Sequence, residues 1–151
     1  MKKELTEEQL FNRLSALCAR AEHCSQEMAA KMRLWQVPDD VQQRVIERLT
    51  KERYIDDGRY ARAYVHDKVR YAKWGRRKIE QALYMKRIPD DAIAAALGEV
   101  DQSEYIEILR PMLQAKAKSI KADSQYELEM KLMRFAAGRG FSVEEAKAAM
   151  R

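Results

Sequence analysis

Apolar residues recur along this chain every three to four positions, which is the spacing that places them on one face of an α-helix. The stripe Leu10, Leu14 and Leu17 near the start is one example, and Leu109 and Leu113 near the end belong to another. Gly (5) and Pro (3) are scarce among the 151 residues, so helices are favoured over hairpin turns. The pattern predicts nine helices and an all-α fold.

A short sequence that ends one helix and starts another occurs three times. Val37-Pro38-Asp39-Asp40 and Ile88-Pro89-Asp90-Asp91 are 51 residues apart, and a weaker copy, Phe141 to Glu145, lies a further 53 residues on. The residue before proline is pushed out of helical geometry, and aspartates in a first turn complement the helix dipole. In the third copy, Ser142 and Glu145 have the spacing of a capping box.

The repeat divides the chain into three units of three helices, at residues 1–53, 54–101 and 102–151. The junctions near Asp56-Asp57 and Asp101-Ser103 resemble helix N-caps rather than flexible linkers. A unit of about 50 residues buries little core alone, so neighbouring units should pack against each other. We therefore expect three tandem three-helix repeats in an elongated, curved modular array. A single compact nine-helix bundle is the alternative.

The composition is that of a charged helical protein with a modest basic excess. The net charge is +5 and the isoelectric point about 9.2, which is compatible with an anionic partner. No run of about 18 apolar residues predicts a membrane span, and the N-terminus lacks the apolar run of a signal peptide. Cys18 and Cys24 match no common metal or redox spacing. We expect a cytoplasmic monomer with reduced thiols.

The basic residues gather in the middle unit, where residues 59–78 hold eight Lys or Arg and one Asp. On a helix with 100° per residue, one arc carries the polar side chains Arg59, Arg62, His66, Arg70 and Lys73. The opposite arc carries Tyr60, Ala61, Tyr64, Val65, Tyr71 and Ala72. We expect this helix to bury its apolar arc and to offer its basic arc to an anionic partner, whereas a solvated charged face is the alternative.

Three further cations, Arg76, Arg77 and Lys78, open the next predicted helix. Cations oppose the dipole at a helix N-terminus, so a local rule is broken and a binding role is favoured. A helix N-terminus with arginines suits a phosphate or carboxylate group.

Lys68 either snorkels past the core edge or points into a cleft. Trp74 either packs over the gap between helices or stacks on a base or a partner side chain.

A second basic set in the last unit is diluted by Glu127 and Glu129, and it is either a contact surface or a solvated face. Its members are Lys116, Lys118, Lys121, Lys131, Arg134 and Arg139.

No catalytic constellation is evident. His23 and His66 stand alone, without a cysteine cluster or an H-E-x-x-H motif, and no Gly-rich phosphate loop exists. Helix capping explains the paired aspartates. We expect a protein that is not an enzyme and that needs no cofactor or metal.

Two stretches of the chain carry recognisable motifs. The middle stretch has Tyr54-Ile55-Asp56-Asp57, Tyr60-Ala61 and Tyr64-Val65, followed by Gly75, Arg77, Ile79, Leu83, Ile88 and Leu97. It resembles the G-Y/F-L-D-D…F-A…Y-V motif of the RecX family and the continuation of that motif. Cys18 to His23, with Ser25, Glu27, Met28 and Met32, is similar to the family's N-terminal signature. The family usually has glycine before the β-branched residue of each repeated turn. Here Gln36 and Arg87 replace it, and only Gly140 remains.

The resemblance implies a regulator that lies in the groove of RecA filaments on single-stranded DNA and contacts both protein and DNA. Such a protein lowers RecA's ATP hydrolysis, strand exchange and co-protease activity, and so regulates DNA repair and the SOS response. Duplex DNA is a further expected partner. One alternative is a sequence-specific duplex binder whose recognition helix starts at Arg76 to Gln81. Another is a scaffold that binds an acidic protein without nucleic acid.

Overall fold

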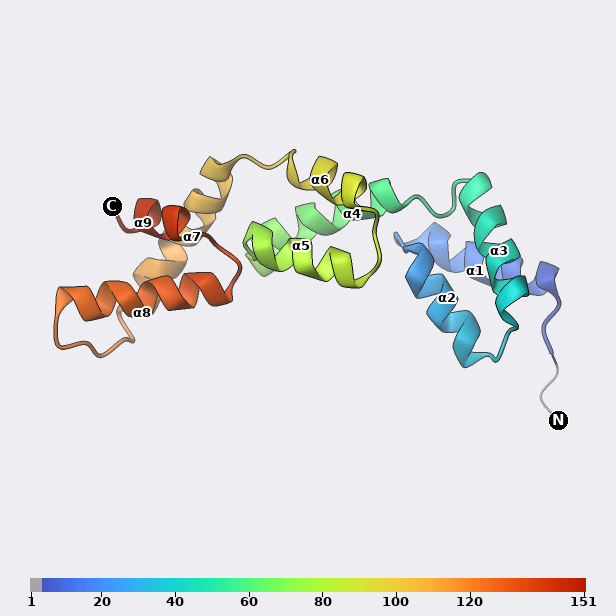
Figure 1. Cartoon of the computed structure of the whole chain (residues 1–151), viewed down its shortest axis with the longest axis horizontal. Coiled ribbons are helices and arrows are strands. Elements are labelled where there is room, and N and C mark those ends of the chain that lie inside the picture. The colour runs from blue at the N-terminus through green and yellow to red at the C-terminus, as the bar shows by residue number, and fades with distance from the viewer. Residues whose placement is uncertain (1–3) are drawn as a thin grey trace.

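The computed structural model describes residues 4–151, which form nine α-helices, one short π-helix and no strand. The helices lie in three groups of three, arranged in an elongated, gently bowed row from one terminus to the other (Figure 1). The predicted all-α array is confirmed, and the single compact bundle is excluded. The elements are α1 (Glu7–Arg20), α2 (Ser25–Leu34), α3 (Asp39–Lys51), α4 (Asp57–Asp67), η1 (Lys68–Ala72), α5 (Arg76–Met85), α6 (Asp90–Leu97), α7 (Gln102–Ala117), α8 (Gln125–Gly138) and α9 (Val143–Met150).

Helices begin where the sequence predicts. Pro38 and Pro89 are the N-cap residues of α3 and α6, and two aspartates fill the first turn of each helix. At α9, Ser142 Oγ accepts the Glu145 N–H at 3.1 Å, and Glu145 Oε1 accepts the Ser142 N–H at 2.8 Å, which completes the capping box. Asp56 caps α4 by accepting the N–H of the residue three positions on, at 2.9 Å.

The three repeated turns share one backbone geometry, although only one contains glycine. Gln36, Arg87 and Gly140 have φ angles of +58°, +59° and +95°. In each turn the next residue donates its N–H to the carbonyl five positions earlier: Val37 to Met32, Ile88 to Leu83 and Phe141 to Ala136. This Schellman motif satisfies carbonyls at the helix end. The missing glycines therefore leave the turn intact and place strain on two ordinary residues.

Two separate hydrophobic clusters fill the interior of the part of the chain that the structure describes. The first belongs to the first group of helices and the residue that follows its last turn: Leu10, Phe11, Leu14, Met28, Met32, Val45, Leu49 and Ile55. The second runs without a break through α4 to α9, from Tyr60 to Ala149, and takes in Cys24 from the loop before α2. The middle and last groups thus share a core, whereas the first group has its own.

Polar contacts dominate the joint between the first and middle groups. Arg59 Nε donates to Glu22 Oε1 at 2.7 Å. The Ser25 N–H donates to Asp57 Oδ1 at 3.2 Å, which ties the start of α2 to the start of α4. Cys24, in the loop between α1 and α2, is buried and adds one apolar contact to the second cluster. The orientation of the first group thus rests mainly on hydrogen bonds and ion pairs.

Two glycines bring the middle and last groups into backbone contact. A Cβ atom on Gly75, the N-cap of α5, would lie 2.3 Å from the carbonyl carbon of Gly140, in the turn between α8 and α9. The Gly75 N–H donates to the Arg139 carbonyl at 2.7 Å, and the Arg77 N–H donates to the Gly140 carbonyl at 3.1 Å. Because no side chain fits between these backbones, both positions require glycine.

The helix that carries most of the basic arc changes its geometry before it ends. After Asp67 the chain continues as the π-helix η1, and Lys73 ends it at φ +58°. A π-helix has more residues per turn than an α-helix. Side chains in η1 therefore point in directions that differ from those predicted with 100° per residue. Val69 is 2% exposed and Tyr71 is 79% exposed. The prediction that Tyr71 lies on the buried arc was therefore wrong.

Candidate nucleic-acid and partner interface

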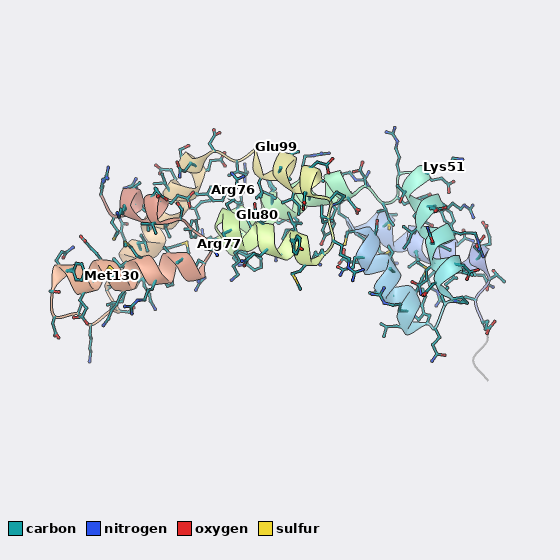
Figure 2. The ribbon with its side chains drawn as sticks, viewed as in Figure 1. Lys51, Arg76, Arg77, Glu80, Glu99 and Met130 are labelled. Carbon is teal, nitrogen blue, oxygen red and sulfur yellow. The ribbon has the colours of Figure 1, made fainter. Side chains whose placement is uncertain are left out.

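The predicted contact residues extend over α4, η1 and the start of α5, in the middle of the row (Figure 1). Five cations are exposed and have no carboxylate oxygen within 4.0 Å among residues 4–151: Arg62, Arg70, Lys73, Arg76 and Arg77. Figure 2 shows Arg76 and Arg77 at the end of α5 that meets the last group. Because these groups lack internal counter-ions, their charges are available to an external anion.

Arg59 differs from the other cations of the arc. Its guanidinium pairs with Glu22 and also donates to the carbonyls of Arg53 and Tyr54, at 3.2 and 3.4 Å. It therefore serves the joint between two groups of helices. His66 is exposed, with Nδ1 3.7 Å from Asp67 Oδ1. We keep His66 in the candidate surface and assign Arg59 to the joint.

Two lysines are oriented by aromatic rings. Lys68 Nζ lies 4.6 Å from the ring centroid of Trp74 and 5.3 Å from that of Tyr64. Lys78 Nζ lies 4.5 Å from the Trp74 centroid. Trp74 is half-buried against the second cluster, so the packing role of this side chain is confirmed. Burial, with a smaller contribution from Glu27, raises the pKa of Tyr64 and keeps its ring neutral beside Lys68.

The start of α5 does not offer all its amide groups to a ligand. The N–H groups of Gly75 and Arg77 already donate to carbonyls of the turn after α8. The expected helix N-terminal anion site is therefore partly occupied by the protein's own backbone. The side chains of Arg76 and Arg77 remain exposed. The candidate surface at this point consists of guanidinium groups rather than of free backbone amides.

The second basic set is divided by its contacts. Lys116 and Arg139 place their charges 5.2 and 5.0 Å from the ring centroid of Phe135. Lys131 Nζ is 3.1 Å from Glu127 Oε1 and donates to the Lys121 carbonyl at 2.7 Å. The side chains of Lys118, Lys121 and Arg134 are exposed. The Arg139 carbonyl accepts the Gly75 N–H, so the backbone of the second set adjoins the start of α5 at this residue.

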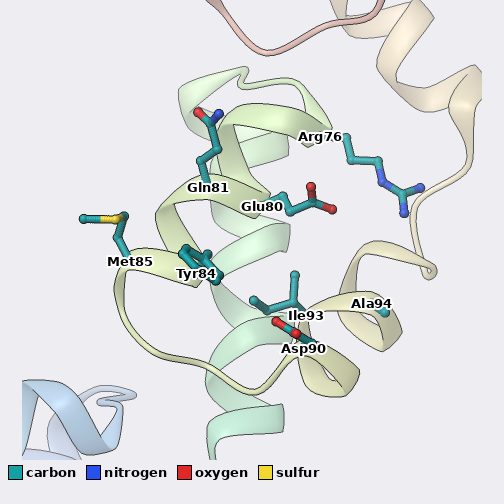
Figure 3. A pocket seen from close by; sticks show the side chains of 8 residues that line it. All are labelled: Arg76, Glu80, Gln81, Tyr84, Met85, Asp90, Ile93 and Ala94. Carbon is teal, nitrogen blue, oxygen red and sulfur yellow. The ribbon is translucent and has the colours of Figure 1, made fainter.

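A groove of about 630 Å³ opens between α5 and α6 (Figure 3). Its lining combines Tyr84 and Ile93 with the carboxylates Glu80 and Asp90, and Arg76 extends from one side (Figure 3). Two carboxylates and one cation make a poor phosphate site, because the carboxylates repel the ligand. The candidate interface is therefore the exposed cationic surface and not this groove.

The described part of the chain contains two free thiols and no metal-binding cluster. Among residues 4–151, no three His, Cys, Asp or Glu side chains gather in a way that would hold a metal ion. Cys18 and Cys24 are free thiols, and burial raises the pKa of Cys24 to about 11. Within the same residues, none of the helices has the length and apolar character needed to cross a membrane.

Sequence periodicity missed two features of the site. The exposure of Tyr71 depends on η1, which left no signal in the pattern of apolar residues. The closeness of Arg139 to the start of α5 depends on the contact between Gly75 and Gly140. The isolated glycines were the available signal for that contact, because a glycine outside a flexible loop often marks a close backbone approach.

Family models match the middle and last groups of helices. The second three-helix domain of RecX matches residues 56–97, and the third three-helix domain matches residues 103–150. The first of these ranges carries the candidate cations. The RecX crystal structure from Lactobacillus salivarius has a TM-score of 0.85 over 95% of this chain and 94% of that chain, at 20% identity, which supports the fold.

Proteins named regulatory protein RecX are similar over most of the chain. The one from Vibrio campbellii is 32% identical over 134 residues, which are 89% of this chain and 84% of that protein. The one from Leuconostoc mesenteroides is 30% identical over 125 residues, and the match spans only about half (47%) of that longer protein. The two domain matches and the long Vibrio alignment agree with the helical repeat array, and we conclude that this chain belongs to the RecX family of regulatory proteins.

Proposed function

We propose that this protein binds RecA filaments on single-stranded DNA and lowers their ATP hydrolysis, strand exchange and co-protease activity, and so regulates DNA repair and the SOS response. It acts by binding and catalyses no reaction itself. The observation that carries the proposal is the exposed, internally unpaired set of cations on α4, η1 and α5, in a chain of the RecX family. The identity of the target comes from the family resemblance.

The shape and charge of the chain suit a filament groove. An elongated row of helical groups with cations in its middle and last parts makes contacts along a groove lined by phosphates and acidic protein. Each phosphate that is neutralised on single-stranded DNA adds about 0.7 to the slope of log affinity against log salt. The contact should therefore weaken steeply as salt rises.

The test compares two doubly substituted proteins in RecA ATPase assays on single-stranded DNA. Arg70→Glu with Arg77→Glu reverses two exposed cations of the candidate surface, and the matched control, Arg33→Glu with Lys51→Glu, makes the same charge change on the first group. We expect the unmodified protein and the control to lower ATP turnover at substoichiometric amounts. The Arg70/Arg77 variant should fail to do so while circular dichroism shows unchanged helicity.

Two results contradict the proposal. One is unchanged ATP turnover when the unmodified protein saturates the filament. The other is equal inhibition by the Arg70/Arg77 variant and the control, which would show that inhibition does not require the candidate surface.

A sequence-specific duplex reader is the second candidate, and the start of α5 argues against it. A recognition helix presents its N-terminal end to the major groove. Here that end is packed against the turn between α8 and α9 through the Gly75 and Arg77 amides. A footprint at one defined duplex sequence would support the second candidate instead.

A further inference from the structure

Tyr71 is the most exposed aromatic side chain among residues 4–151, with 79% of its surface accessible. Its ring makes no aromatic or cation–π contact with another residue of this part of the chain. Single exposed rings are common on protein surfaces, so the backbone and the charges around Tyr71 decide whether this ring has a role.

The backbone around Tyr71 holds the ring outward. In η1 the N–H groups of Lys73 and Trp74 both donate to the Lys68 carbonyl, the latter at 2.9 Å. Lys73 takes up a left-handed conformation, which strains an ordinary residue. A regular α-helix would place Tyr71 on the apolar side. π-Helical turns and strained residues occur frequently at functional sites, where they set the direction of a side chain.

The charges beside Tyr71 distinguish it from Tyr126, the next most exposed tyrosine among residues 4–151. Exposed Arg70 precedes Tyr71 directly, and exposed Lys73 follows two positions later. The acidic residue nearest in sequence is Asp67, whose Oδ1 lies 3.7 Å from His66 Nδ1. Tyr126 is 73% exposed but is followed by Glu127. Tyr71 is thus an exposed ring within a cationic surface.

We propose that Tyr71 is a stacking platform for one base of single-stranded DNA and that Arg70 and Lys73 bind the phosphates on either side. The inference rests on the proposed function, in which single-stranded DNA is a partner. A ligand that satisfies both a flat apolar ring and two flanking cations is a polyanion with exposed aromatic faces. Single-stranded DNA has this chemistry, whereas a duplex stacks its base faces against each other.

The experiment measures binding of the full chain to DNA alone, without RecA, by fluorescence anisotropy. One probe is an oligothymidylate of about 12 nucleotides, in the range of known single-strand sites. The second has the same phosphates but abasic sugars. The variants are Tyr71→Ala, Tyr71→Trp and the matched control Tyr126→Ala. Circular dichroism checks that each variant is folded.

Tyr71→Ala should weaken oligothymidylate binding about fivefold to 150-fold, as expected for the loss of one stacked base, and leave abasic binding unchanged. Tyr71→Trp and Tyr126→Ala should bind both probes like the unmodified protein. If Tyr71 stacks on a base, Tyr71→Ala lowers the affinity for the probe with bases and not the affinity for the abasic probe.

Three results overturn the inference: no loss with Tyr71→Ala, an equal loss on the abasic probe, or no binding of the unmodified chain to either probe. If Tyr71→Ala weakens only RecA inhibition, Tyr71 contacts protein and the stacking role is excluded. Inhibition of RecA by the unmodified chain is measured separately, so a failure here leaves the proposed function to its own test.

Discussion

At the scale of single residues, all three repeated turns have the same backbone geometry, although two of them lack the glycine that the family usually has there. Gln36 and Arg87 hold φ angles of +58° and +59°, which the side chains of L-residues disfavour. The left-handed region costs such a residue about 1–2 kcal/mol. The Schellman hydrogen bonds and the packing of the following Val37 and Ile88 maintain the geometry. These positions therefore lower the stability of the chain below what its contacts allow.

Arg87→Gly should raise the free energy of unfolding by about 0.5–1 kcal/mol. Glycine relieves the left-handed strain, and its greater freedom in the unfolded chain offsets part of that gain. Urea denaturation followed by circular dichroism measures the change. Arg87→Ala is the matched control, because alanine removes the same side chain but retains the Cβ atom that causes the strain. If the glycine variant is no more stable than the alanine variant, backbone strain at Arg87 does not lower the free energy of unfolding.

At the scale of helices and turns, the contact between α5 and the turn after α8 decides how the middle and last groups join. Gly75→Ala would place a methyl group 2.3 Å from the Gly140 carbonyl carbon, which is backbone and has no rotamer to change. The two groups must separate to admit it. We expect a loss of about 2 kcal/mol or more in unfolding free energy, in the range of core overpacking.

Gly138→Ala is the control for that substitution. A Cβ atom at Gly138 meets nothing within 4 Å, and the residue lies at the end of α8, where alanine is a good helix former. Thermal unfolding should show this variant at least as stable as the unmodified chain. Equal effects of the two substitutions would mean that the close approach of Gly75 and Gly140 is not a tight contact.

Helix starts could be predicted from the sequence, whereas one tertiary ion pair and the π-helix could not. Helix starts at Pro38 and Ser142 were predictable because capping depends on residues within one turn. The pairing of Arg59 with Glu22 was not, because it joins residues 37 positions apart in a tertiary contact. The π-helix was missed for another reason. It changes the phase of a helix without changing its composition, so a uniform 100° step placed Tyr71 on the wrong face.

At the scale of the whole molecule, the two joints differ in kind. The middle and last groups share one hydrophobic cluster, whereas the first group has a cluster of its own. Its joint to the middle group consists mainly of polar contacts, such as the Arg59–Glu22 pair and Lys86 Nζ at 3.8 Å from Glu27 Oε2. Partly exposed ion pairs contribute about 0–1 kcal/mol each. The first group is therefore coupled to the rest less strongly than the other two are coupled to each other.

This difference predicts two cooperative units in native-state hydrogen exchange. With rising urea, amides of α1 to α3 should exchange together at one free energy of opening and those of α4 to α9 at another, because each hydrophobic cluster opens as a unit. Gly75→Ala provides the internal check, since it alters the contact inside the second unit only. It should lower the opening free energy of α4 to α9 and leave that of α1 to α3 unchanged. If all the helices instead share one opening free energy, and Gly75→Ala lowers it throughout, the polar joint couples the groups as tightly as a shared core does.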